Sequence, residues 1–262
     1  MKNTIKNSIQ PLSVLSKQAV IVLIVGQVTI ALLVWHMSGG GLIPSPLKVL
    51  TSIISLLGSD VFYIEFFKSI FLSFKGMGIS LVVAILISYL SLVPLFNPIA
   101  KFVIKCRYLT LTGLIFLFML LTNDGGQLKL SLLLFGIVPF FVTSLMSIID
   151  SINVQEYELC KTLRMNNWQT LWEVVIVGRL DQVIEVMRQN FAISWMMITM
   201  VEGYSMSEGG LGTMLIKSNK ILDLVTVFAI LVIIFLIGIF FDFILGQIRY
   251  WLFPYTKLQI RK

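Results

Sequence analysis

The chain has 262 residues, of which 57% are hydrophobic and 13% are charged, and its mean hydropathy is +0.94. A soluble domain is about one quarter charged, so this composition excludes an ordinary soluble protein and predicts an integral membrane protein. The formal net charge of +7 comes from basic residues spread along the chain rather than gathered in one patch. We therefore expect contact with membrane lipid and no nucleic-acid partner.

Six apolar runs predict six transmembrane helices, because about 20 apolar residues cross the hydrocarbon core of a bilayer. In chain order these predicted spans are 19–37, 76–93, 108–122, 128–149, 182–201 and 221–247. The predicted fold class is all-α, a polytopic membrane helix bundle. Spans and short loops use all the length, so we expect residues 1–262 to form a single transmembrane domain.

Two more helices are predicted beside the first spans. Pro46 opens an amphipathic helix that continues to Leu57, and we place it on the outer membrane surface. The run 61–93 would form a helix about 50 Å long, which exceeds one upright crossing. We therefore expect an interfacial helix that ends near Lys75, followed by the second span.

A polar loop of about residues 150–181 separates the fourth and fifth spans and keeps a helical pattern. In its second half apolar residues recur at i, i+3, i+4, i+7 and i+8, namely Trp168, Leu171, Trp172, Val175 and Ile176. Asn166 and Asn167 precede this stripe, and Asn both tolerates the left-handed conformation and caps helices. The pattern predicts helix, turn and helix at the membrane surface. From the pattern alone, an interfacial connector is an equal interpretation.

The fifth span carries polar side chains in its first half, including Glu185, Arg188, Gln189 and Asn190. A charged residue at the bilayer centre costs several kcal/mol, so these side chains should face protein or water.

Basic residues indicate the orientation. With six spans both termini lie on one side, together with the 150–181 loop and most lysines and arginines. The other side holds four lysines: Lys48, Lys129, Lys217 and Lys220. The positive-inside rule then places the termini and the loop in the cytosol. Cys106 and Cys160 also fall on that side, where thiols stay reduced.

The central loop resembles the permease components of bacterial ABC importers of the nitrate/sulfonate/taurine type. Their loop carries a Glu-Ala-Ala signature, then Leu-Gly-Ala-Ser, a Trp and a Val-Val pair. The matching residues here are Glu158, Leu163, Trp168, Val174 and Val175, and further matches in register are Arg188, Trp195, Glu202 and the Gly210-Leu211-Gly212 run. This chain departs from the pattern at several positions: Leu72, Leu159, Cys160, Arg164, Val177 and Asp181.

The resemblance implies a multi-pass protein of the bacterial cytoplasmic membrane, working as a homodimer. Its implied partners are an ABC ATPase on the cytosolic face and a periplasmic or lipid-anchored solute-binding protein. The implied solute is a sulfonate-, nitrate- or taurine-like anion. The implied ATPase-coupling residues are Glu158, Leu159, Cys160, Leu163, Arg164, Asn166 and Trp168.

Candidate residues for the solute pathway are Arg188, Gln189, Trp195, Glu202 and Tyr204. For each of them, packing inside the bundle is at least an equal interpretation. Arg164 stands where the resembling permeases have Gly, and an Arg adopts positive φ poorly. We therefore expect Asn166 or Asn167 to make the turn, and Arg164 to stay helical.

The chain has no Gly-x-x-x-x-Gly-Lys-Ser/Thr run, so we expect it not to be an enzyme and ATP hydrolysis to occur in a separate subunit. One His makes a metal site unexpected, and we expect no other cofactor. Two alternatives stay open. One is a self-sufficient secondary transporter or channel that uses Arg188 and Glu202 as an ion relay. The other is a divergent, non-transporting partner of an ABC complex.

Overall fold

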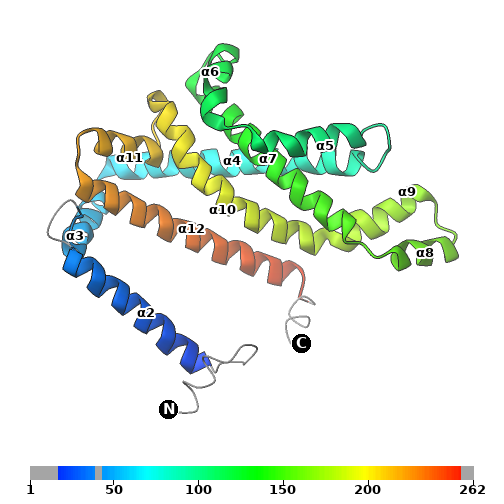
Figure 1. Cartoon of the computed structure of the whole chain (residues 1–262), viewed down its shortest axis with the longest axis horizontal. Helices are drawn as coiled ribbons and strands as arrows, with labels where there is room; N and C mark the ends of the chain where they lie inside the picture. The colour runs from blue at the N-terminus through cyan, green and yellow to red at the C-terminus, as the bar shows by residue number, and fades with distance from the viewer. Residues whose placement is uncertain (1–16, 39–42, 255–262) are drawn as a thin grey trace.

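The computed structural model describes residues 17–38 and 43–254, and within these ranges all regular secondary structure is helical (Figure 1). The long helices are α2 (Lys17–Ser38), α4 (Asp60–Leu90), α7 (Gly125–Asp150), α10 (Leu180–Tyr204) and α12 (Leu224–Leu252). The shorter helices are α3 (Pro46–Leu57), α5 (Asn97–Lys105), α6 (Leu111–Leu121), α8 (Val154–Thr162), α9 (Asn167–Thr170) and α11 (Leu211–Lys220). The predicted all-α membrane helix bundle is confirmed.

Four of the described helices, α2, α4, α7 and α12, are long and apolar enough to cross a membrane. The pair of Asn97–Tyr108 and α6 is bent by 113° and makes a fifth span if it crosses as one unit. The helix α10 is long enough but is not among them, because its first half carries Asp181, Glu185 and Arg188. The total of six spans stays a prediction.

The helix α4 is continuous from Asp60 to Leu90, so the predicted break near Lys75 is wrong. A stripe of small buried residues runs along α4 from Ser69 to Ser88, on both sides of Lys75: Ser69, Ser73, Gly76, Ser80, Ala84 and Ser88. Small residues let two helices approach closely, and a Cβ added at Gly76 would overlap Leu133 of α7. The packing face therefore continues through Lys75, and no proline interrupts it.

The core lies between α4, α7, α10 and α12, where Ile137, Phe141, Phe191 and Ile198 are fully or almost fully buried. By contrast, α2 diverges from the other long helices (Figure 1). It is attached near its end, where Trp35 Nε1 donates to the carbonyl of Pro44 at 3.0 Å and the Trp35 ring lies 6.3 Å from that of Phe228. The apolar residues along α2 are exposed, as expected for a helix surrounded by lipid or by a partner.

The other predicted helices match the structure with shifted ends, and α3 begins at Pro46 as expected. The helix α11 was not predicted, because residues 211–220 were treated as part of the connection between the fifth and sixth spans. The sixth span begins at Leu224 rather than at Ile221. Some basic residues used for the orientation lie outside the described residues, namely Lys2, Lys6, Lys257, Arg261 and Lys262.

Candidate coupling hairpin and polar sites

The helices α8 and α9 form a hairpin at the end of the molecule opposite α3 and α11 (Figure 1). The turn between them is closed by two backbone bonds, from Arg164 N–H to Lys161 O and from Met165 N–H to Cys160 O, each 3.0 Å. Arg164 has φ 56°, in the left-handed region. These two bonds and the left-handed residue form a Schellman motif, which ends many helices.

The prediction that Arg164 stays helical is therefore wrong. The left-handed residue of a Schellman motif is the one after the C-cap. The C-cap of α8 is Leu163, so the position falls on Arg164. Asn166 instead has φ −70° and begins the next helix. Its backbone N–H donates to Gln169 Oε1 at 2.8 Å as part of a capping box, so the predicted capping role of an asparagine is confirmed.

The second half of the loop is less regular than predicted. After α9 the chain forms a π-helical turn at Leu171–Ile176 and a 3₁₀ turn at Val177–Arg179. A π-helical turn holds more residues than an α-helical turn, so it divides the predicted stripe between two sides. Val175 is buried, whereas Trp168 and Trp172 are 68% and 58% exposed.

The predicted coupling residues share the outer surface of the hairpin, with one exception. Leu159 and Leu163 are exposed like Trp168, and so are Glu158, Arg164 and Asn166. Cys160 is only 5% exposed and lies in the interior of the chain. A cavity of about 230 Å³ in the hairpin is lined by residues that include Tyr157, Lys161 and Leu171. Burial raises the pKa of the Tyr157 phenol, which therefore stays neutral.

An ion-pair cluster joins α10 to α12 at the hairpin end of the bundle. Arg188 donates to Glu185 at 2.7 Å and to both carboxylate oxygens of Asp242 at 3.2 Å. Arg249 donates to the second oxygen of Glu185 at 2.6 Å and lies 3.9 Å from Asp181. The charges of the first half of α10 thus pair with one another and with α12, as a helix in a membrane requires.

The other predicted pathway residues lie in different surroundings. Gln189 is exposed and donates to Glu185 at 3.4 Å. Trp195 is buried, stacks on Phe191 and donates to the carbonyl of Ile234 at 2.9 Å, which is a packing role. Tyr204 ends α10 and is 41% exposed. The structure therefore does not gather the five predicted residues into one site.

Glu202 is the centre of a buried network at the other end of the bundle. Its carboxylate accepts from Ser69 Oγ at 2.7 Å and from Gly212 N–H at 2.8 Å, and the residue is 1% exposed. Ser69 Oγ accepts in turn from Leu211 N–H at 2.8 Å. Glu65 accepts from Gly210 N–H. These contacts attach the glycine-rich segment before α11 to α4 and α10.

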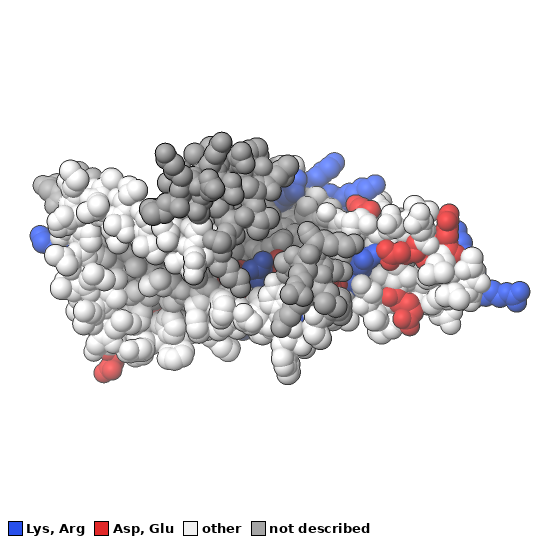
Figure 2. Space-filling view, turned by 90° about the horizontal axis from the view of Figure 1, so that it is seen from below, with Lys and Arg blue, Asp and Glu red and all other residues white. Residues whose placement is uncertain are grey.

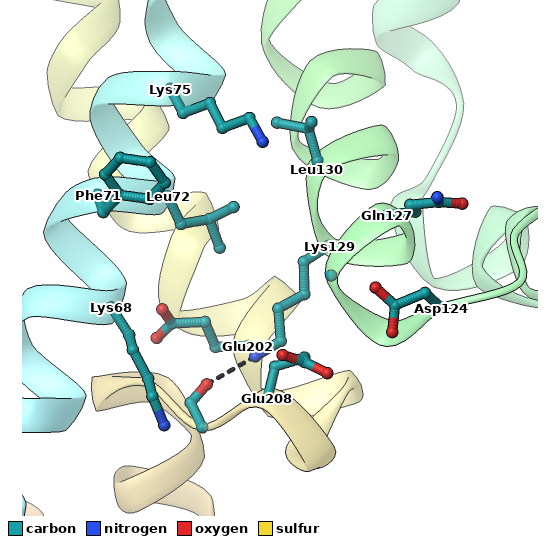
Figure 3. A pocket seen from close by; sticks show the side chains of 12 residues that line it. Lys68, Phe71, Leu72, Lys75, Asp124, Gln127, Lys129, Leu130, Glu202 and Glu208 are labelled. Atoms are coloured by element: carbon teal, nitrogen blue, oxygen red, sulfur yellow. Dashed lines mark hydrogen bonds between the residues drawn. The ribbon is translucent and has the colours of Figure 1, made fainter.

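A cavity of about 360 Å³ adjoins this network, between α4 and the beginning of α7 (Figure 3). Lys129 is only 3% exposed, and its ammonium donates to the carbonyl of Gly209 at 2.6 Å. Lys68 and Lys75 of α4 line the same cavity. Three lysines from two helices that are far apart in the sequence thus line one cavity, together with the carboxylates of Asp124, Glu202 and Glu208.

Residues 62–249 match the family model described as binding-protein-dependent transport system inner membrane component. The match covers most of the chain. The chain belongs to this family. Membership makes it a permease component of an ABC transporter, a multi-pass membrane protein that works with an ABC ATPase and a substrate-binding protein. No curated protein matches the chain.

The matched region of this permease contains the hairpin, the ion-pair cluster and the lysine-lined cavity, whereas α2 and α3 precede it. Sequence reasoning did not assign Lys68, Lys75 or Lys129 to a site. The available signal was the spacing of Lys68 and Lys75, which are seven residues apart in an apolar helix and therefore share a face. Lys129 had no such signal, because its partner Gly209 is 80 residues away.

Proposed function

We propose that this permease belongs to an ATP-driven importer and that the α8–α9 hairpin docks into the ATPase. One observation carries the proposal. The hairpin exposes Leu159, Leu163 and Trp168 at the end of the molecule where charged side chains gather (Figure 2). Exposed apolar residues on a projecting, charged surface favour a protein contact, since a few central apolar residues supply most of the energy of an interface.

The connection between hairpin and spans supports transmission of motion. The π-helical and 3₁₀ turns lead directly from α9 into α10, and Arg179 pairs with Glu156 of α8. The Arg188–Asp242 and Arg249–Glu185 pairs then tie α10 to α12. When ATP closes the ATPase subunits, a displaced hairpin would therefore tilt α10 and α12 together. ATP drives this change only because it binds one state of the complex more tightly.

The turn at Arg164 supports a relationship to the nitrate/sulfonate/taurine type. The left-handed residue lies where the resembling permeases carry Gly. The hairpin therefore has the backbone turn that a Gly favours, with Arg164 in its place. For this permease we infer import of a small sulfonate-, nitrate- or taurine-like anion, a homodimer, and no enzymatic activity of its own. The cytosolic location of the hairpin and both termini, in a bacterial inner membrane, follows from the distribution of basic residues.

The test is retention of the ATPase by hairpin variants. Glu158→Lys and Leu163→Asp should release the ATPase, or uncouple its ATP hydrolysis from transport, without lowering the thermal stability of the permease. The matched control is Ile221→Asp, since Ile221 is 76% exposed at the end of α11, away from the hairpin. Full ATPase retention and transport in both hairpin variants would refute docking through this surface.

Reconstitution separates this proposal from its two alternatives. In liposomes the purified permease alone should show no solute flux under an ion gradient. Gradient-driven uptake by the permease alone would favour a secondary transporter. A complex that retains the ATPase and hydrolyses ATP, but moves no solute, would identify a non-transporting partner.

A further inference from the structure

Arg107 is a cation beside the middle of an apolar helix. It lines a cavity of about 300 Å³ together with Phe135 and Phe140, which lie on either side of the midpoint of α7. The helix α7 is long and apolar enough to cross the membrane. A charged side chain at this depth costs several kcal/mol if it faces lipid, and Arg107 is exposed. Its exposed side must therefore border water, a ligand or another protein.

Most hydrogen-bond donors of Arg107 are free. Among the described residues its partner is the neighbouring Tyr108, whose hydroxyl accepts from Nη2 at 3.1 Å and whose ring centre lies 5.1 Å from the guanidinium. A guanidinium has five N–H donors, and this contact uses one of them. The sequence has no Asp or Glu between Glu65 and Asp124, and the described residues that line the cavity include no acid. The charge of Arg107 is therefore not neutralised there.

The carboxylate closest in sequence to a lining residue is engaged elsewhere. Glu202 follows the lining residue Met200 by two positions. Its carboxylate accepts from Ser69 of α4 and from the Gly212 amide, and it does not line this cavity. The cavity thus differs from the lysine-lined one, where carboxylates and ammonium groups occur together.

The rest of the lining combines two hydroxyls with apolar surface. Thr110 and Thr112, at the start of α6, are exposed, and no described residue forms a hydrogen bond with either side chain. The first N–H groups of α6 lack partners within the helix and add positive character at the same place. Gly136 of α7 leaves room, because a Cβ there would lie 2.8 Å from the sulfur of Met197. The free guanidinium and the two hydroxyls are the donors that the cavity offers.

We propose that this cavity binds the oxoanion group of the transported solute, with Arg107 as its cation. The inference rests on the proposed function, because it assigns the ligand to transport. Two guanidinium donors match two oxygens of a planar or tetrahedral oxoanion, and a threonine hydroxyl matches a third. A cavity of about 300 Å³ has room for a small organic anion whose short apolar part contacts Phe135 or Met197. A lipid phosphate at the membrane surface would lie about 15 Å from mid-span, so the ligand is a dissolved anion.

The test measures thermal unfolding of the permease–ATPase complex in detergent, with methanesulfonate as the probe and potassium chloride as the reference salt of equal ionic strength. Saturating methanesulfonate should raise Tm by about 3–6 °C over chloride. Arg107→Gln should abolish this rise. Arg107→Lys should keep only part of it, because the charge stays while the two-pronged geometry is lost. Lys101→Gln removes an exposed lysine of α5 that does not line the cavity, so the full rise should remain.

Three outcomes overturn the inference. An equal rise in Arg107→Gln would place anion binding elsewhere, and no rise in the wild-type complex would mean that the cavity takes no small oxoanion. A rise with phosphatidylglycerol in the micelles, but none with methanesulfonate, would identify a lipid phosphate as the ligand. If Arg107→Gln does not fold, Thr112→Val decides, because it removes one hydroxyl donor at nearly constant volume and should reduce the rise. An undiminished rise in that variant would then refute the site.

ATPase retention, measured on the same samples, reports on the proposed function separately. A complex that keeps its ATPase but shows no rise that depends on Arg107 would refute this site and leave the permease assignment standing. Release of the ATPase by the hairpin variants leaves the anion test unaffected, since Arg107 lies outside the α8–α9 hairpin.

Discussion

At the scale of single residues, Gly212 is a position where neighbouring backbone leaves no room for a side chain. A Cβ at Gly212 would overlap the backbone of Thr199, where α11 crosses α10. Backbone atoms cannot rotate away as a side chain does, so relief requires a shift of one helix. We expect Gly212→Ala to destabilise the permease by about 1–3 kcal/mol, as overpacked sites do, and to lower Tm in detergent.

Gly78→Ala is the control for Gly212→Ala. Nothing lies within 4 Å of a Cβ added at Gly78, and this residue is within the α-helix α4. Ala is favoured over Gly inside a helix by about 0.5–1 kcal/mol, so this variant should be as stable as the wild type or more stable. Equal losses in the two variants would show that crowding at Thr199 is not the cause.

Arg164 carries the strain of the α8–α9 hairpin. A non-glycine residue in the left-handed conformation costs about 1–2 kcal/mol. We predict that Arg164→Gly relieves this cost and leaves ATPase retention intact, whereas the β-branched Arg164→Val makes it worse. Hydrogen exchange of the amides from Cys160 to Gln169 would measure both effects. Faster exchange in Arg164→Gly than in the wild type would mean that the arginine side chain, rather than the backbone turn, holds the hairpin together.

At the scale of elements, the pairing of α10 with α12 depends on a few charged side chains. Glu185 receives Arg188 on one oxygen and Arg249 on the other, and these side chains are 20–31% exposed. Arg249→Gln should therefore loosen the end of α12, by about 1 kcal/mol since solvent reaches the pair. Hydrogen exchange near Arg249 should rise, with Lys217→Gln as an unaffected control. An unchanged exchange rate would mean that apolar packing alone holds α12 to α10.

The elements also show what the sequence could and could not predict. Apolar runs located the long helices, and Pro46 located the start of α3, because these signals are local. The continuity of α4 was missed because length alone argued for a break, whereas its small-residue stripe meets α7. Arg164 was misassigned because its conformation is imposed by the end of α8, against the preference of the residue.

The polar sites were harder to predict because they join distant segments. Glu202 was selected from the sequence, but its partner Ser69 is 133 residues away, and Lys129 was counted only as a charge of the outer loops. Arg188 was selected for a pathway, and the structure shows it paired with Glu185 and Asp242. A single sequence identifies costly residues in a span, but which of them neutralise one another depends on helix packing.

At the scale of the whole molecule, the two ends of the bundle differ in how they hold charge. The hairpin end exposes most of the charged side chains on the face seen in Figure 2. At the opposite end, Lys129 is buried and makes a specific contact with Gly209. Of the four lysines predicted to lie on the outer side, Lys48, Lys217 and Lys220 are exposed, and the predicted asymmetry of basic residues stays a prediction.

This asymmetry makes a prediction about sidedness that tests the whole arrangement. In a variant with Cys106 and Cys160 replaced by Ser, a cysteine at Ser218 should react with a membrane-impermeant maleimide on intact spheroplasts. A cysteine at Asn167, which is exposed in the hairpin, should react only after the membrane is opened. The reason is that the hairpin contains the basic residues Lys161 and Arg164, and short basic loops stay in the cytosol. Labelling of position 167 from outside would place the hairpin on the side of the membrane that has no ATP. That result would refute ATPase docking, whereas the family membership would stand.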